Sequence, residues 1–197
     1  MKNTHKELTQ IQELVLSILD VKRNHRIPGT ERRENVVEHS FSVALLCWKL
    51  YSALKPDLDL GKILTYAFVH DFTERGQDYD TNTYASQSER SAKEEREKKE
   101  IEKISNEFGN FTEMVTMLNT YETFADEESR FVWAVDKMQS MILGGLDNWR
   151  PYELYGVKYD KFLDKGNEFV SKCPSCLKEV MQEVVAESCK TYYDQPV

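Results

Sequence analysis

The sequence predicts an all-α fold in a single domain, and three observations carry that prediction. Apolar residues recur at spacings of three and four in several segments, which is the stripe of an amphipathic helix. The 197 residues include only eight glycines and five prolines, few for a protein of many short strands and turns. No pair of strands joined by a hairpin turn is recognisable. With 40% hydrophobic residues the chain can build one proper core, so we expect a bundle of about seven helices over 1–197.

Three of the expected helices lie in the N-terminal part of the chain. Residues 6–20 carry the amphipathic stripe, and a polar, basic connector with a Pro-Gly turn signal follows at 21–34. Residues 35–55 are apolar enough for a largely buried helix that stops before a proline. Residues 59–72 predict a third helix with an apolar body, and 76–83 have the composition of a loop.

The C-terminal part of the chain predicts four more helices. Residues 86–103 alternate Glu with Lys and Arg, which is typical of a solvated helix whose charges face water. Residues 111–124 and 127–146 repeat the helical spacing of apolar side chains. An aromatic stretch, 148–162, is expected to be irregular, and a closing helix is expected from about 175 to 193.

Charge and hydropathy exclude several classes of protein. The formal net charge of −8 leaves no broad basic surface for nucleic acid. No apolar run approaches the roughly 20 residues that span a bilayer, and the amino end lacks the apolar stretch of a secretory signal. We therefore expect a cytoplasmic protein that binds neither nucleic acid nor a membrane.

The four cysteines are expected to be reduced, because a core of this size needs no disulfides. Cys173 and Cys176 form a C-P-S-C string that resembles half of a zinc site. A structural zinc ion needs four ligands, and no second pair of this kind exists in the sequence. The preferred interpretation is a helix start with Pro174 in its first turn.

Ionisable side chains interrupt three apolar helix segments. They are His39, the pair His70 and Asp71, and Asp136. Each one alone is explained as a core polar group with a hydrogen-bond partner. Together they supply two imidazoles and two carboxylates, which is a ligand set for one divalent transition metal such as manganese, cobalt, iron, nickel or zinc. Such a site, with water positions left open, generates a hydroxide-like nucleophile near neutral pH.

Glu74 follows His70 by four residues and Asp71 by three. If the helix continues for one more turn, its carboxylate projects from the same face. It then serves either as a general acid or base beside a metal-bound water or as the cap of a loop. Its position in the sequence does not decide between these roles.

Three strings of the sequence, taken together, resemble a known family. They are ENVVEHS at 34–40, HDFTE at 70–74 and VDKM at 135–138. In this order they look like the signatures of the HD-domain metal-dependent phosphohydrolases, and among these most like the compact 5′-deoxynucleotidase branch. The resemblance covers about 20–145, which leaves 146–197 as a helical extension of an HD-type bundle.

The resemblance implies roles for individual residues. His39, His70, Asp71 and Asp136 would hold the metal, with Asp71 also counted among the catalytic groups, and Glu74 would assist proton transfer. An arginine before the first histidine helix would hold the substrate phosphate, because a guanidinium matches phosphate oxygens. The candidates for this role are Arg23 and Arg26. The candidates for recognising the sugar are Asp78 and Asp80. A homodimer is also implied.

The expected function is therefore that of a phosphomonoesterase that converts (deoxy)nucleoside 5′-monophosphates to nucleoside and phosphate. One alternative keeps the same metal site but takes deoxynucleoside triphosphates. Another is a nucleotide-sensing or scaffold module without turnover, although every expected ligand is a residue able to coordinate a metal. The native metal and the preferred base and sugar stay open.

Overall fold

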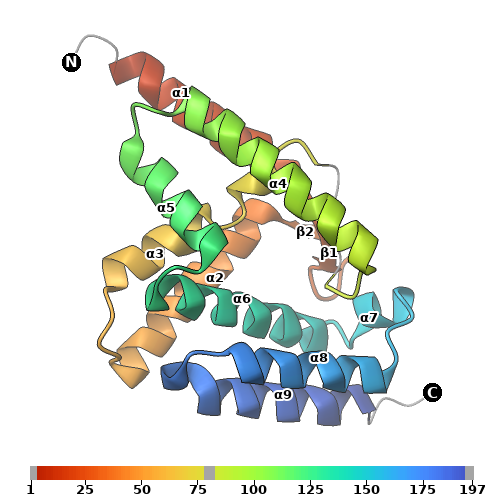
Figure 1. The fold of residues 1–197 in the computed structure, drawn as a ribbon. Coiled ribbons are helices and arrows are strands. Elements are labelled where there is room, and N and C mark those ends of the chain that lie inside the picture. Colours follow the sequence, from red (N-terminus) through yellow and green to blue (C-terminus); the bar gives the residue numbers. More distant parts are fainter. Residues whose placement is uncertain (1–3, 78–82, 194–197) are drawn as a thin grey trace.

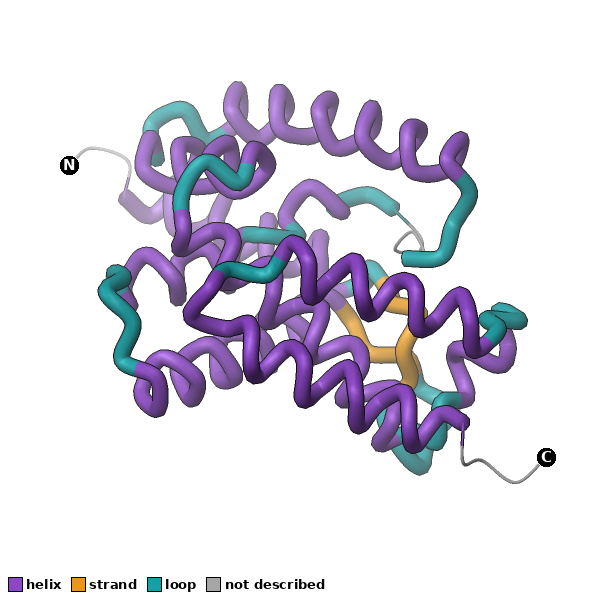
Figure 2. The backbone as a smooth tube through the Cα atoms, turned by 60° about the horizontal axis from the view of Figure 1, so that its bottom comes forward, coloured by secondary structure: helices purple, strands orange, loops and turns teal. Residues whose placement is uncertain are grey.

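The computed structural model describes residues 4–77 and 83–193, and within them it confirms the all-α class (Figure 1). Helices make up most of this backbone, and the strands form one short pair (Figure 2). The α-helices are α1 (Thr4–Leu19), α2 (Val36–Leu54), α3 (Leu60–Val69), α4 (Gln87–Glu107), α5 (Thr112–Thr123), α6 (Glu127–Leu146), α7 (Arg150–Leu154), α8 (Tyr159–Lys172) and α9 (Lys178–Tyr193). The strands are β1 (Lys22–Arg26) and β2 (Arg33–Asn35), and the 3-10 turns are η1 (Phe72–Glu74) and η2 (Ser175–Leu177).

Helix α6 is the centre of the molecule. It packs against α2 and α3 on one side and against α9 on another, and α8 pairs with α9 along the edge of the bundle (Figure 1). The largest buried cluster of apolar side chains draws on all five of these helices. Any polar side chain that α6 places in this interior therefore needs partners from its neighbours.

The strand pair corrects the expectation that no hairpin is present. Strands β1 and β2 are antiparallel, with Lys22 opposite Asn35 and Arg26 opposite Arg33. The sequences KRNHR and REN contain no apolar alternation, which is the signal that a half-buried strand ordinarily gives. Because the buried residues of this hairpin are charged ones held by ion pairs, hydrophobic periodicity could not reveal it.

Helices α7 and α8 account for the difference between the seven expected helices and the nine found in the described residues. Both begin within the stretch 148–162 that was expected to be irregular. Trp149, with a φ of 58°, turns the chain into α7. A Cβ at Gly144 would lie 2.5 Å from the ring of Tyr152, so only glycine lets this aromatic segment fold back on α6. The expected closing helix is present as η2 followed by α9.

Helix α2 begins at a capping box. The Asn35 side chain accepts a hydrogen bond from the Glu38 N–H, and the Glu38 carboxylate accepts one from the Asn35 N–H. This local motif places His39 just inside the helix. The expected burial of α2 holds for one face only, since Phe41, Leu45 and Trp48 on the other face are exposed.

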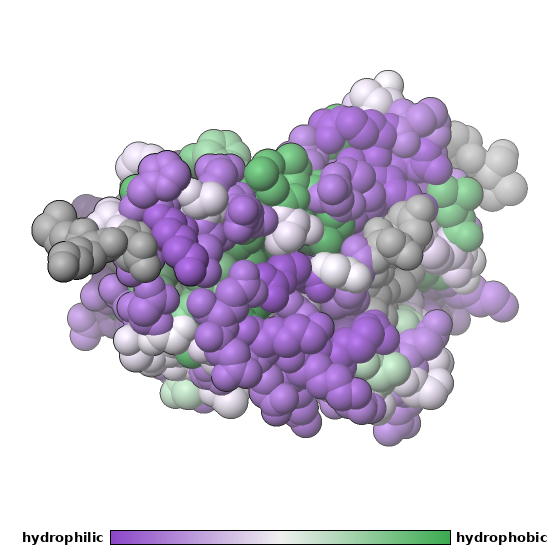
Figure 3. Space-filling view, turned by 90° about the horizontal axis from the view of Figure 1, so that it is seen from above, coloured by the Kyte–Doolittle hydropathy of each residue, from purple (hydrophilic) through white to green (hydrophobic). Residues whose placement is uncertain are grey.

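The remaining surface and the cysteines follow the sequence-based predictions. Side chains of α4 are mostly exposed, and a view from above shows a largely hydrophilic surface with apolar groups toward its middle (Figure 3). No described helix is both long and apolar enough to cross a bilayer. All four cysteines are free thiols, and Pro174 directly precedes η2, as the helix-start interpretation expects.

Candidate metal centre

The four residues expected to bind a metal meet in the interior. His39 comes from the first turn of α2, His70 caps the end of α3 and Asp136 lies midway along α6. The Nε2 atom of His39 lies 3.2 Å from Nε2 of His70 and 3.1 Å from Oδ1 of Asp136. Oδ2 of Asp71 lies 3.5 Å and 3.4 Å from the same two nitrogens. The side chains therefore surround one point from three helices.

The hydrogen bonds of the two imidazoles fix which nitrogens face that point. Nδ1 of His70 lies 3.0 Å from the carbonyl oxygen of Ala67, which can only accept, so Nδ1 carries the proton. Nδ1 of His39 lies 3.1 Å from the amide oxygen of Gln139 and donates in the same way. In the neutral rings both Nε2 atoms then present lone pairs to each other and to carboxylate oxygens. A divalent cation is the group that fits such a convergence of electron pairs.

The pKa shifts favour the protonation states that metal ligands need. Burial and the charge of Arg23 lower the pKa of His39, which keeps its imidazole neutral. Burial acts to raise the pKa of Asp136, but the charges of Lys137, whose Nζ is 2.6 Å from Oδ2, and of Arg23 hold that pKa well below its usual range. Both groups are therefore in their metal-binding form near neutral pH.

Of the two candidate arginines, only Arg23 reaches the cluster. Its Nη1 donates to Oδ2 of Asp71 at 2.9 Å, and its Nη2 lies 3.7 Å from Oδ1 of Asp136. Arg26 instead pairs with Glu31 at the exposed end of the hairpin. The strand pairing is irregular between Lys22 and Arg26, so the two arginines lie on either side of a break in the register and reach different partners.

Two buried residues of the site were not predicted. Gln139 lies one turn after Asp136 on α6, and its Nε2 donates to Oε1 of Glu34 at 3.0 Å. Burial raises the pKa of Glu34 to about 7, against the opposing effect of Arg23. Glu34 stands in the quoted ENVVEHS string, and Gln139 lies at helical spacing from Asp136, so both signals were present in the sequence. Neither residue is expected to bind the metal directly. The role of each depends on contacts that form only in the folded protein.

Glu74 occupies a different position from the one a continuing helix would give it. Helix α3 ends at Val69, and Glu74 closes the 3-10 turn η1. Its buried carboxylate accepts a hydrogen bond from Nζ of Lys93 on α4 at 3.0 Å. Arg75 likewise donates to Glu100 of α4. Part of the charge on α4 thus ties that helix to η1, rather than serving only as a solvated face.

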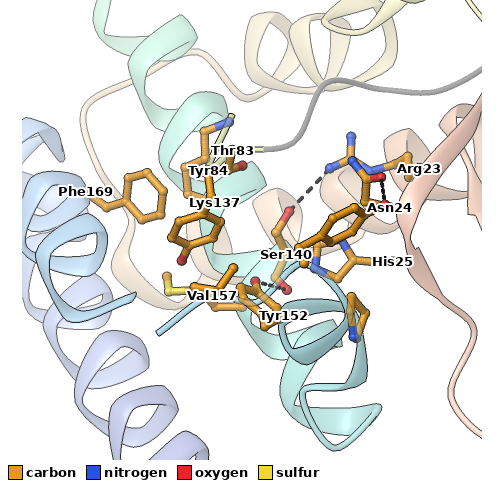
Figure 4. A pocket seen from close by; sticks show the side chains of 13 residues that line it. Arg23, Asn24, His25, Thr83, Tyr84, Lys137, Ser140, Tyr152, Val157 and Phe169 are labelled. Carbon is orange, nitrogen blue, oxygen red and sulfur yellow. Dashed lines mark hydrogen bonds between the residues drawn. The ribbon is translucent and has the colours of Figure 1, made fainter. Parts of the chain in front are cut away.

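A cleft of about 730 Å³ opens onto the cluster and is lined by His70, Asp71, Asp136 and side chains of α4 and α5. Within it, burial and the charge of Glu97 raise the pKa of Glu122 to about 7. A second, aromatic pocket lies on the other side of Lys137, beside Arg23, and Tyr84 and Tyr152 line it (Figure 4). Asp78 and Asp80, the candidates for sugar recognition, lie outside the described residues.

Among residues 4–77 and 83–193, the group of at least three His, Cys, Asp or Glu with ligand atoms within 4.8 Å of one another consists of His39, His70 and Asp136. Asp71 adjoins it through the contacts above. The pair Cys173 and Cys176 gains no further ligand among these residues.

Comparison with known proteins gives one family and two similar structures. The HD domain family model matches residues 18–176. A structure described as a predicted metal-dependent phosphohydrolase, from Magnetospirillum magnetotacticum MS-1, superposes with a TM-score of 0.79 at 21% identity and covers 100% of both chains. The PH0347 protein of Pyrococcus horikoshii OT3 gives a TM-score of 0.60 at 21% identity, over 91% of this chain and 99% of its own. No curated protein matches the chain significantly.

Proposed function

Because this chain belongs to the HD domain family, we propose that it is a metal-dependent phosphohydrolase that converts (deoxy)nucleoside 5′-monophosphates to nucleoside and phosphate in the cytoplasm. The observation that carries the proposal is the convergence of two imidazole Nε2 atoms and two carboxylates at 3.1–3.5 Å, with a guanidinium beside them. The description of the Magnetospirillum structure, a predicted metal-dependent phosphohydrolase, supports the reaction class in this proposal.

Different side chains have different roles in the proposed phosphate hydrolysis. His39, His70, Asp71 and Asp136 would hold the cation, which supplies Lewis-acid activation of a bound water and of the phosphate. Arg23, with Nη1 2.9 Å from Asp71, is placed to donate to the phosphate oxygens and offset their charge. Glu74, which closes the 3-10 turn η1 after Asp71, is proposed to move a proton to the leaving oxygen.

The aromatic pocket supports a nucleoside as the leaving group. It adjoins the cluster through Arg23 and Lys137, and the rings of Tyr84 and Tyr152 stand 5.9 Å apart at its wall (Figure 4). A base gains contact energy by stacking or edge packing on such rings, whereas a simple phosphate would gain nothing from them. The pocket encloses only about 50 Å³, so the rings of Tyr84 and Tyr152 would have to move apart to admit a nucleoside whose phosphate is bound at the cation.

Charge in the cleft favours a monophosphate over a triphosphate. Apart from Asp71 and Asp136, which are expected to hold the cation, the described lining has four carboxylates against three lysines: Glu94, Glu97, Glu102 and Glu122 against Lys93, Lys98 and Lys137. Two added phosphate groups would bring further negative charge against this wall. The wall therefore favours the substrate with fewer phosphate groups.

The test is release of inorganic phosphate from ribo- and deoxynucleoside mono- and triphosphates with added manganese, cobalt, magnesium or zinc. Wild type is compared with Asp71→Asn, and Asp57→Asn, an exposed carboxylate between α2 and α3, is the control. We expect release from monophosphates, a loss of about a thousandfold in Asp71→Asn, in the range for removal of an important transition-state contact, and no change in the control. Tripolyphosphate as the product would move the assignment to the triphosphate alternative.

Two further expectations are tested on the same preparations. Protein purified without chelator or affinity tag should contain about one equivalent of metal, whereas a scaffold module without turnover would contain none. The homodimer stays a prediction, and sedimentation equilibrium at several protein concentrations would decide it.

A further inference from the structure

A buried carboxylate, Glu34, connects two parts of the site that the reaction uses separately. It is the middle residue of strand β2, directly before Asn35, the cap of α2, and only 3% of its surface is exposed. Its Oε1 faces Gln139, and its Oε2 lies 3.4 Å from Nε of Arg23 and 3.7 Å from Nδ1 of His39. One oxygen is directed to the arginine proposed to hold phosphate, and the other to the residue that orients a metal ligand.

The first arm leads to Arg23. Oε2 of Glu34 lies 3.4 Å from Nε of Arg23, while the far end of the same guanidinium reaches Asp71 and Ser140. The charge of the buried carboxylate holds the Nε side of the guanidinium, while the hydrogen bonds to Asp71 and Ser140 set the direction of its rigidly coplanar N–H groups. The Nη atoms are thereby directed at the point where the metal ligands meet.

The second arm leads to His39 through Gln139. Oε1 of Glu34 accepts from Nε2 of Gln139 at 3.0 Å, and the amide oxygen of Gln139 accepts from Nδ1 of His39 at 3.1 Å. Because a carboxylate can only accept, it forces the amide of Gln139 to turn its oxygen toward His39. That orientation in turn leaves Nε2 of His39 as the lone pair that faces the site.

We propose that Glu34 is a positioning residue that aligns Arg23 for phosphate with one oxygen and His39 for the metal with the other. The phosphate arm rests on the proposed function, because it assumes that Arg23 binds the substrate phosphate. The metal arm rests only on the donor set of the site. The two arms make separable predictions, which a residue that merely stabilises the fold would not.

Two substitutions separate the arms. Gln139→Met keeps the side-chain length but removes the acceptor for Nδ1 of His39, and it leaves Glu34 facing Arg23. Glu34→Gln keeps the shape but has one acceptor for two neighbours. With metal on His39, Nδ1 must donate to Gln139, so the single acceptor of residue 34 is engaged by Gln139. The N–H groups of the glutamine at position 34 then face Nε of Arg23. Two donors now face each other, so the contact that holds Arg23 for phosphate is lost.

Matched controls come from the same chain. Glu31→Gln alters an exposed carboxylate of the same hairpin, which pairs with Arg26 and Arg150 instead of Arg23. Gln182→Met makes the same chemical change on the exposed face of α9. Circular dichroism and thermal unfolding of all four variants establish that they are folded before binding is measured.

The first measurement is calorimetric titration of metal-free protein with Mn²⁺ alone. We expect Gln139→Met to weaken Mn²⁺ binding about 10- to 100-fold, and Glu34→Gln and both controls to change it less than about threefold. The second is displacement by inorganic phosphate at saturating Mn²⁺. There we expect Glu34→Gln to weaken phosphate binding about tenfold or more, as for loss of a charge-assisted contact, and Gln139→Met to leave it unchanged.

Equal losses of Mn²⁺ and phosphate affinity in both variants would overturn the proposal, because they would indicate a general loss of structure. Unchanged affinities in both variants would overturn it as well. Since neither titration contains a nucleotide, the expected pattern together with no phosphate release from nucleotides would sustain the positioning role and reject the proposed substrates. Return of phosphate affinity in Glu34→Asp would add support, because that change restores the charge.

Discussion

The metal centre and the aromatic cluster that follows α6 are both buried, but they are built in opposite ways. Around Asp136 the interior holds charged and polar groups, with Arg23, His39 and Glu34 each less than 8% exposed. Around Trp149 it holds rings: Tyr152, Phe162 and Tyr192 lie 5.2–5.4 Å from the Trp149 ring. Helix α6 thus contributes to a polar interior around Asp136, and the segment that follows α6 forms an aromatic interior around Trp149.

The aromatic cluster stabilises the folded state, whereas the buried charges of the metal centre cost part of the folding free energy. Edge-to-face rings bury large apolar areas and add favourable ring contacts. Buried charges require desolvation, and their pairing returns only part of that cost. The buried groups around Asp136 are of the types that can hold a divalent cation, which is the role proposed for them. We therefore expect the two regions to respond differently to mutation, metal and pH.

The largest effect is expected from Trp149→Ala in the aromatic cluster. Removing a ring that is 2% exposed should lower the free energy of unfolding by about 3–5 kcal/mol. Urea denaturation measures this loss, and Trp48→Ala, an exposed tryptophan of α2, should cost less than about 1 kcal/mol. Calorimetric Mn²⁺ affinity should stay within about threefold of wild type. A large change in that affinity would show that the two regions are not independent.

A smaller effect is expected from metal at the other region. Mn²⁺ at a hundred times its dissociation constant should stabilise the folded protein by about 2.7 kcal/mol, and chelator should reverse this. The gain arises because the cation binds only where the folded chain brings the four ligands together. Thermal unfolding with and without Mn²⁺ measures it in wild type and in Asp71→Asn. An equal shift in the variant would place the bound metal elsewhere.

The smallest effect is expected at the partly exposed ion pair of Lys62 with Asp126. This pair provides a comparison for the buried ion pairs of the metal centre. Although burial opposes it, hydrogen bonds from Lys62 and Tyr66 lower the pKa of Asp126 to about 2 from its usual 3.8. A depressed carboxyl pKa stabilises the folded state above about pH 4 and loses that contribution as pH falls toward 2. Asp126→Asn keeps the cap of α6 but loses the charge.

We therefore expect Asp126→Asn to be less stable than wild type by about 1 kcal/mol near neutral pH, since water screens the pair. The difference should shrink as the pH falls from 4 to 2. Urea denaturation across this range measures it. A difference that is constant with pH would mean that the loss does not come from the charge of Asp126, and that the amide does not replace the hydrogen bond that Asp126 accepts from the Ser129 N–H.

Much of the fold was predictable because it depends on local pattern. The amphipathic spacing of 127–146 and the capping string before His39 indicate α6 and the start of α2 without any tertiary information. The hairpin β1–β2 and the short helix α7 were not predictable in this way, because charged and aromatic residues form them and partners distant in the sequence decide their conformation. Helix α8 was predictable, since Phe162, Phe169 and Val170 recur on one face at helical spacing.

For the site, the sequence by itself determined which side chains could bind a metal, because His39, His70, Asp71 and Asp136 interrupt apolar segments where a lone charge is too costly. Only the tertiary structure decided how they are used. In the folded protein Arg23, and not Arg26, reaches the cluster, and Gln139 connects Glu34 to His39. The Nε2 atoms of both histidines face one point. The physical reason is that residue type sets what an atom can bind, whereas hydrogen-bond direction and strand facing are set by contacts across 30 to more than 100 residues of chain.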